Sequence, residues 1–334
     1  MSLLPSPTLA FTIPMTAVAR GYTRPVHLVY IHGHRCLWRL HNNSGDTKIV
    51  TVSSLMPYPV TRFAPSPTGL LHLGHAYSAL VASQLGDGYI LRIDDIDHTR
   101  CRPEFTEAIY RDLEFLGLPW REDPIFQSRR LDAYADALAS LRARDLVYPC
   151  FLTRTELADV LSAPQEAPVA TDSAISAGEA VRRAEQGVEP AWRLRTATAL
   201  ELVGDLTWRD LRGGVNRPVD MTAHGDVVLA RRDIGTSYHL SVVVDDSLDG
   251  VTLVTRGADL EDSTHIHRLL QALLDLPSPG YFHHDLVRDP AGNRLAKRHD
   301  ARSIQTFREA GQTAEDIITS LPPTPDSLPF ERDF

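Results

Sequence analysis

Hydrophobic positions change their spacing repeatedly between residues 56 and 149. Short apolar runs at Val60–Ala64 and Tyr89–Ile93 predict strands, whereas apolar residues at steps of three and four predict helices over Ala76–Leu85 and from Leu131 onwards. Another helix is predicted after Pro103, because proline is favoured at the first helical position and an apolar stripe follows: Phe105, Ile109, Leu113 and Leu116. Strands that alternate with helices predict a parallel sheet with crossover helices, an α/β fold.

The alternation breaks between Ala163 and Pro190, where the composition predicts loops and one short helix over Ala177–Gln186. Strands are then expected at Asp226–Arg231, Tyr238–Val244 and Val251–Thr255. The helix that follows is predicted to have Asp262 or Ser263 as its N-cap, with a buried stripe of Ile266, Leu269, Leu270, Leu273 and Leu274.

Five parts of the chain follow from these patterns. Residues 56–149 and 225–285 are predicted to be the two halves of one sheet domain, split by an inserted α/β subdomain over residues 150–224. Residues 286–334 are expected to form a loop and a short helical C-terminal segment. Residues 1–55 contain five basic residues against one acid, Asp46. They are interpreted as an N-terminal extension, either disordered or the product of a misplaced start site.

Composition narrows the class of protein. A chain of 334 residues with 43% hydrophobic and 23% charged positions is typical of a globular protein of about two domains. No apolar run approaches the roughly 20 residues of a membrane span, so no membrane partner is expected. Cys36, Cys101 and Cys150 have no paired spacing, which favours a reducing compartment, the cytoplasm.

The net charge of −9 excludes a generally basic surface, so an RNA partner would need a local basic patch. The densest run of arginines on predicted helical segments is Arg129, Arg130, Arg142, Arg144, Arg182 and Arg183. The alternative is that these arginines only pair with nearby acids.

Candidate chemistry is concentrated in two adjoining segments. Arg62–Gly69 (RFAPSPTG) reads as a strand end followed by a Pro/Gly turn, and His72–His75 (HLGH) opens the next helix. A helix N-terminus offers unpaired backbone N–H groups and the positive end of the dipole, so it suits a phosphate. Two imidazoles three residues apart share one face there and can donate hydrogen bonds to a triphosphate.

These two segments together resemble the first signature of class I aminoacyl-tRNA synthetases, in the branch that activates glutamate. Leu91–Asp97 (LRIDDID) and Arg256–Leu260 (RGADL) resemble further segments of that branch, and Arg294–Arg298 (RLAKR) resembles its second signature. Only two of the 34 basic residues are lysines, and Lys297 is the one that falls in this second signature. The resemblance implies a Rossmann-like catalytic domain, with ATP as a substrate and Mg²⁺ accompanying it.

Within that branch the chain is similar to the glutamyl-queuosine tRNA(Asp) synthetase family. Only 36 residues follow Arg298, fewer than a separate domain needs, so no anticodon-binding domain is expected. The similarity implies a monomer that activates L-glutamate and transfers it to the queuosine base of tRNA(Asp). The alternatives are a truncated glutamyl-tRNA synthetase that charges a tRNA 3′ end and an inactive paralogue that binds RNA or an amino acid.

The resemblance also assigns roles to individual residues. Contacts to ATP are expected from His72, Gly74, His75 and Lys297, and catalysis is expected from His72, His75 and Lys297. Glutamate contacts are expected from Arg62, Phe63, Ala64, Pro65, Ser66, Asp94, Tyr238 and Arg256. Asp94 stands where the family usually has a glutamate that receives the substrate ammonium. The alternative for Arg62 and Arg256 is a structural ion pair, and for Tyr238 a half-buried position on a strand.

Two further expectations concern acids and metals. Asp95, Asp97, Asp245 and Asp246 are expected to cap turns and hold arginines rather than to bind a metal, because the reaction needs no protein nucleophile. Many members of the family bind zinc through several cysteines, but Leu152 stands where the second of these would be, two residues after Cys150. One thiolate cannot build a tetrahedral site, so zinc is not expected.

Overall fold

The structure is a computed structural model in two compact units, residues 1–57 and 58–334. It describes the backbone of three strands in the first unit, and in the second unit residues 59–86, 88–153, 155–156, 175–288 and 302–325. The three strands, β1 (His27–Ile31), β2 (Arg35–His41) and β3 (Thr47–Val52), form an antiparallel sheet in the order β1-β2-β3. The region interpreted as an extension therefore contains β structure.

A parallel sheet organises the second unit, as the sequence predicts. β4 (Arg62–Phe63), β5 (Ile90–Ile93) and β6 (Arg121–Phe126) pair in parallel. So do β12 (Leu253–Gly257) and β13 (Gly280–His284). The two groups meet where the Leu253 N–H donates to the Val60 carbonyl at 3.1 Å. Strands almost 200 residues apart therefore lie side by side.

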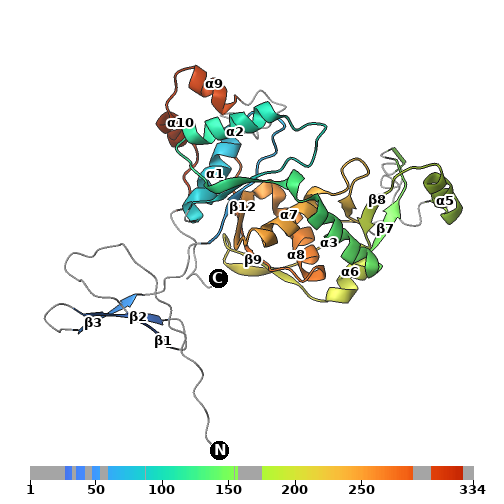
Figure 1. Cartoon of the computed structure of the whole chain (residues 1–334), viewed down its shortest axis with the longest axis horizontal. Coiled ribbons are helices and arrows are strands. Elements are labelled where there is room, and N and C mark those ends of the chain that lie inside the picture. The colour runs from blue at the N-terminus through green and yellow to red at the C-terminus, as the bar shows by residue number, and fades with distance from the viewer. Residues whose placement is uncertain are drawn as a thin grey trace, which may run out of the picture. The chain divides into compact units, whose positions relative to one another are not determined.

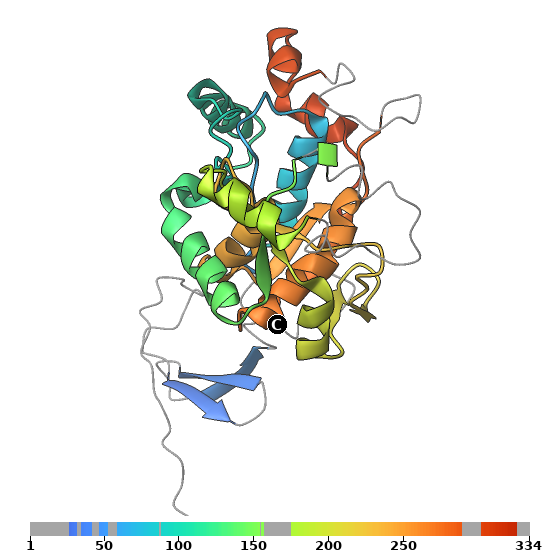
Figure 2. The same cartoon turned by 90° about the vertical axis from the view of Figure 1, so that its right-hand side faces the viewer.

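Helices cover this sheet at the positions that the periodicity predicts. α1 (Leu73–Leu85), α2 (Pro103–Phe115) and α3 (Leu131–Ala143) follow successive parts of the first half. The short helices α9 (Ile304–Glu309) and α10 (Ala314–Ser320) lie beside α1 and α2 (Figures 1 and 2). The buried side chains of Ile304 and Ile317 on these helices, and of Leu321 just after α10, complete a core that includes Ala79, Leu91, Ile109 and Leu113.

The inserted region contributes to two different sheets. β7 (Val147–Cys150), β8 (Ala191–Leu194) and β11 (Val228–Ala230) form an antiparallel sheet in the order β11-β8-β7. β9 (Thr207–Asp210) and β10 (Val215–Pro218) instead extend the parallel sheet at β13. The hydrogen bonding therefore does not follow the predicted division between residues 224 and 225. The described residues of this region also form the helices α5 (Ala177–Glu185) and α6 (Thr196–Val203).

The strand predicted at Tyr238–Val244 is wrong, because these residues begin helix α7 (Tyr238–Leu248). The Ser237 hydroxyl accepts a hydrogen bond from the Leu240 N–H at 3.5 Å and caps this helix. Three consecutive valines imitate a strand, since β-branched residues favour extended backbone. Burial of Leu240 and of those valines in the core shared with α3 and α8 outweighs that weak preference.

The N-cap predicted for the last long helix is also wrong. α8 (Glu261–Leu273) continues directly from a 3₁₀ turn at Ala258–Leu260, so Leu260 precedes it and makes no side-chain cap. The predicted stripe Ile266, Leu269, Leu270 and Leu273 is buried as expected. Leu274 lies just past the helix end and is half-buried. Among the described residues no helix is long and apolar enough to cross a membrane.

Candidate active site

A cavity of about 560 Å³ opens at the carboxyl ends of β4, β5, β12 and β13. In α/β sheets ligands bind at this edge, where loops leave neighbouring strands. The cavity brings together all the predicted site residues that the structure describes: Arg62, Phe63, Ala64, Pro65, Ser66, His72, Gly74, His75, Asp94, Tyr238 and Arg256. Lys297 lies outside the described residues.

Two histidines, His72 and His75, cap the N-terminus of α1. The Gly74 N–H donates to His72 Nδ1 at 3.1 Å, and the His72 N–H donates to His75 Nδ1 at 3.2 Å. The two rings stack with their centroids 3.8 Å apart. Because each Nδ1 accepts a hydrogen bond, each neutral ring carries its proton on Nε2. A Cβ on Gly74 would lie 3.0 Å from the His72 ring, so glycine lets the rings approach the backbone.

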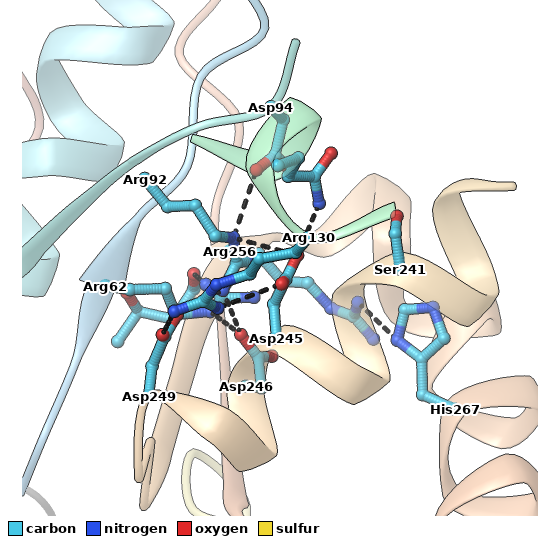
Figure 3. A network of polar contacts seen from close by, with 12 residues as sticks. Arg62, Arg92, Asp94, Arg130, Ser241, Asp245, Asp246, Asp249, Arg256 and His267 are labelled. Carbon is cyan, nitrogen blue, oxygen red and sulfur yellow. Dashed lines mark hydrogen bonds and ion pairs between the residues drawn. The ribbon is translucent and has the colours of Figure 1, made fainter. Parts of the chain in front are cut away.

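Beneath the cavity lies a buried network of arginines and aspartates (Figure 3). Arg92 is fully buried and forms ion pairs with four carboxylates: Asp94 at 3.0 Å, Asp245 at 3.6 Å, Asp246 at 2.8 Å and Asp249 at 3.2 Å. Three of these acids lie in or just after the last turns of α7.

Arg62 joins the same network from the end of β4. Its Nε lies 3.0 Å from Asp246 Oδ1, and its Nη1 donates to the Thr255 carbonyl at 3.0 Å. Arg62 is therefore in a structural ion pair, which was the alternative for this residue, and it also lines the cavity. The protein itself fixes this guanidinium before any ligand binds.

Asp94 lines the cavity, and the pKa of its carboxyl group is raised above its ordinary value. Its Oδ1 accepts a hydrogen bond from Arg92 Nε at 3.0 Å. Burial, and the nearby charge of Asp245, outweigh the attraction of Arg92 and Arg62 and raise the pKa of Asp94 to about 7. A cationic ligand group beside this carboxyl group would favour its ionised form.

Three other acids that the sequence analysis named hold turns or neighbouring side chains. Asp95 accepts hydrogen bonds from the N–H (2.8 Å) and hydroxyl (2.7 Å) of Ser128, and so caps a turn. Asp97 accepts from Thr99 at 2.6 Å and from Arg100 at 2.8 Å. Asp245 accepts from Gln127, Arg130 and Tyr134. Among the described residues no group of three or more His, Cys, Asp or Glu side chains is arranged to hold a metal ion.

Comparison with known proteins assigns the chain to a family. Residues 60–322 match the family described as tRNA synthetases class I (E and Q), catalytic domain. A glutamyl-Q tRNA(Asp) synthetase of Rhodobacter capsulatus is 46% identical over 276 residues, which cover 77% of this chain and 98% of that protein. One from Symbiobacterium thermophilum is 40% identical over 276 residues and 84% of its length. The chain belongs to the glutamyl-Q tRNA(Asp) synthetase family of class I tRNA synthetases.

A solved structure supports the same fold. The crystal structure of a glutamate tRNA ligase from Elizabethkingia meningosepticum, in complex with its amino acid, matches with a TM-score of 0.64 and 26% identity. The match covers 78% of this chain, but the chain spans only 59% of that ligase. The parallel-sheet class I synthetase fold that the sequence predicts is thereby confirmed.

The segment around Cys150, where other members of the family bind zinc, is packed with apolar side chains in this synthetase. Cys150 and Leu152 are buried in a small cluster with Tyr148, and Ile175 packs against it. Arg232 Nη2 donates to the Leu152 carbonyl at 2.7 Å, which fastens the segment to the loop after β11. Leu152 therefore takes part in packing, and the expectation that zinc does not bind here stays a prediction.

Several arginines proposed for RNA binding have partners within this synthetase. Arg130 forms ion pairs with Asp245 at 2.9 Å and with Asp249 at 2.5 Å. Arg183 forms ion pairs with Glu156 at 2.7 Å and Glu179 at 2.6 Å. Arg142 stacks on Trp192 at 4.0 Å. These contacts favour the alternative interpretation, in which the arginines hold nearby groups of the same chain.

Sequence reasoning missed the residues that support the site. Arg92 lies in the motif LRIDDID, so a basic residue flanked by apolar strand positions was the available signal. His267 and His283, which contact Arg256, lie on α8 and β13 and carry no local motif. The pairing of Ser303 with His72 was also missed, and it fastens the chain after the second signature to the first signature.

Proposed function

We propose that this protein activates L-glutamate with ATP to form glutamyl-adenylate, and transfers the glutamate to the queuosine base at the wobble position of tRNA(Asp). The observation that carries the proposal is one cavity lined by the helix N-terminus that bears His72 and His75, by buried Arg62 and Arg256, and by Asp94. The acceptor is inferred from the names of the glutamyl-Q tRNA(Asp) synthetase relatives, one of which is matched over 98% of its length.

The cavity offers an opposite charge to two ionic groups of glutamate, the ammonium group and the side-chain carboxylate. Asp94 suits the ammonium group, and Arg256, with Arg62 behind it, suits the side-chain carboxylate. The α-carboxylate then remains free to attack the α-phosphorus of ATP, and pyrophosphate leaves. A hydroxyl of the queuosine cyclopentene diol next attacks the carbonyl carbon of the adenylate, and AMP leaves. The protein contributes alignment and stabilisation of spreading charge rather than a nucleophile.

The phosphates would lie at the N-terminus of α1. There the Nε2–H donors of His72 and His75 can follow the charge that develops on the leaving pyrophosphate. Lys297 is proposed to add a flexible positive charge from the second signature. Val287 lines the cavity and Ser303 pairs with His72, so both flanks of that loop start beside the phosphate site. Mg²⁺ is expected to accompany ATP, bound largely by phosphate oxygens.

Transfer to the modified base is the sharpest test. Purified protein, ATP and glutamate are incubated with tRNA(Asp) that contains queuosine and with the same tRNA lacking it, and the nucleosides are analysed by mass spectrometry. Glutamate on queuosine alone would support the proposal. Glutamate on the 3′ end of either tRNA would identify a conventional charging enzyme. No glutamate-dependent ATP–pyrophosphate exchange would indicate the inactive paralogue.

Replacement of the signature histidines should slow activation without unfolding the protein. Asparagine at position 72 or 75 keeps an acceptor near the place of Nδ1, so the cap of α1 survives while the Nε2–H donor is lost. We expect the exchange rate to fall about 100-fold for each variant, the usual cost of one lost donor to developing charge. Thermal unfolding should change little, and a variant that unfolds instead would show that the imidazole is structural.

Glutamate affinity should increase as the pH rises through neutrality. Asp94 must be ionised to bind the ammonium group, and its pKa of about 7 means that most molecules are protonated at pH 6. The KM for glutamate should therefore be about 10-fold higher at pH 6 than at pH 8. The Asp94→Asn variant has no such carboxyl group, so its weaker glutamate binding should lose this pH dependence. If the KM for glutamate depended equally on pH in wild type and in Asp94→Asn, the pH dependence would belong to another group.

A further inference from the structure

Arg256 is a buried cation whose hydrogen-bond partners are all uncharged. Its side chain lines the cavity, yet the residue is only 5% exposed. Nη2 donates to the Thr264 hydroxyl at 2.6 Å, and Nε donates to His283 Nε2 at 3.3 Å. Nη1 lies 3.1 Å from His267 Nδ1 and 3.5 Å from the Tyr238 hydroxyl oxygen. Within the described part of the chain this guanidinium forms no ion pair.

The other two buried arginines of the site differ in this respect. Arg62 is paired with Asp246, and Arg92 contacts four carboxylates (Figure 3). Buried charges are normally paired in this way, because an isolated charge is costly to remove from water. The charge of Arg256 is therefore left for a ligand to compensate.

The geometry requires His267 to be neutral. A guanidinium has only donors, so His267 Nδ1 must accept the hydrogen bond from Arg256. The proton of the His267 ring then sits on Nε2, which lies 3.2 Å from His239 Nδ1 and donates to it. Figure 3 shows the His267 ring on α8 turned towards the Arg256 guanidinium. Burial and the nearby Arg256 charge also lower the pKa of His283 to about 3 and that of His239 to about 4.

We propose that His267 and His283 are positioning residues that determine specificity for an anionic amino-acid side chain. They hold the Arg256 guanidinium by accepting its hydrogen bonds, but they supply no negative charge. This inference rests on the proposed function, in which the bound anion is the side-chain carboxylate of glutamate. A neutral carboxamide such as that of glutamine would leave the buried cation without a counter-ion, so it is rejected.

A matched pair of variants at position 267 separates charge from shape. Asparagine places a neutral oxygen near the position of Nδ1, whereas aspartate has the same shape and adds one negative charge. For His267→Asn we expect a KM for glutamate within a few-fold of wild type. For His267→Asp we expect that KM to rise roughly 10- to 100-fold with a smaller change in kcat, because the new carboxylate occupies Arg256. Its preference for glutamate over glutamine should fall by a similar factor.

Glutamate and glutamine binding is measured by calorimetry as well as by ATP–pyrophosphate exchange. If wild type binds glutamate but shows no exchange, the proposed function fails while the specificity test still stands. Equal glutamate affinity in the asparagine and aspartate variants would overturn the inference. Should His267→Asp not fold, His283→Gln and His283→Glu give the same comparison, because a glutamine oxygen reaches the position of Nε2. Thermal unfolding shows whether each variant is folded, and ATP affinity, which the charge should not alter, is the control.

Discussion

Lys297→Ala should reduce glutamate-dependent ATP–pyrophosphate exchange by about 100- to 1,000-fold, the range seen when one charge-stabilising group is removed from a transition state. Lysine is almost absent from this chain, and arginine serves as the general surface cation. A compact ammonium on a flexible stem reaches phosphate oxygens as a point charge, which a planar guanidinium does not reproduce. Glutamate binding, measured without ATP, should stay close to wild type.

The chain supplies its own control for this experiment. Lys48 is the other lysine, and it lies on β3 in the separate N-terminal unit. Lys48→Ala should leave the exchange rate unchanged, while Lys297→Arg should recover only part of the lost activity. Wild-type exchange by Lys297→Ala would refute the assignment of the second signature.

Arg92→Met should cause the largest loss of stability of any change at the site. Methionine approximates the length of the arginine side chain but leaves Asp94, Asp245, Asp246 and Asp249 without their shared cation. Removal of one partner from a buried ion pair typically costs about 3–5 kcal/mol of unfolding free energy. Urea unfolding at pH 7 measures this loss directly.

The pH dependence of that loss has a defined sign. In the variant, Asp94 loses its ion pair with Arg92, so burial raises its pKa still further above that of the unfolded chain and the folded state binds more protons. Its stability should therefore fall as the pH rises, and the deficit relative to wild type should shrink from pH 7 to pH 5. Arg182→Met is the control, because that arginine is an exposed ion-pair partner of Glu179 and should matter little. Equal stability of Arg92→Met and wild type would show that the acids are not repelling one another.

Local patterns in the sequence were sufficient for several helices, α1, α2 and α3 among them, and for the first signature. α2 and α3 have apolar stripes at helical spacing, so their buried faces could be predicted without knowledge of their neighbours. The first signature is contiguous, and chain connectivity alone holds Arg62 close to His72 and His75. Residues such as Asp94 and Arg256 were reached through the family resemblance, because they are distant in sequence and meet only in the folded sheet.

Tertiary contacts decided the remaining features. The valines of α7 have extended preference, and only their burial in the core shared with α3 and α8 makes the segment helical. β6 has the sequence REDPIF, in which three charged residues precede three apolar ones, so it shows no alternating strand pattern. It becomes a strand because β5 offers a free edge. The partners of Arg256 come from α7, α8 and β13. No sequence period links these segments, so the uncharged surroundings of that arginine exist only where the packed sheet and helices bring them together.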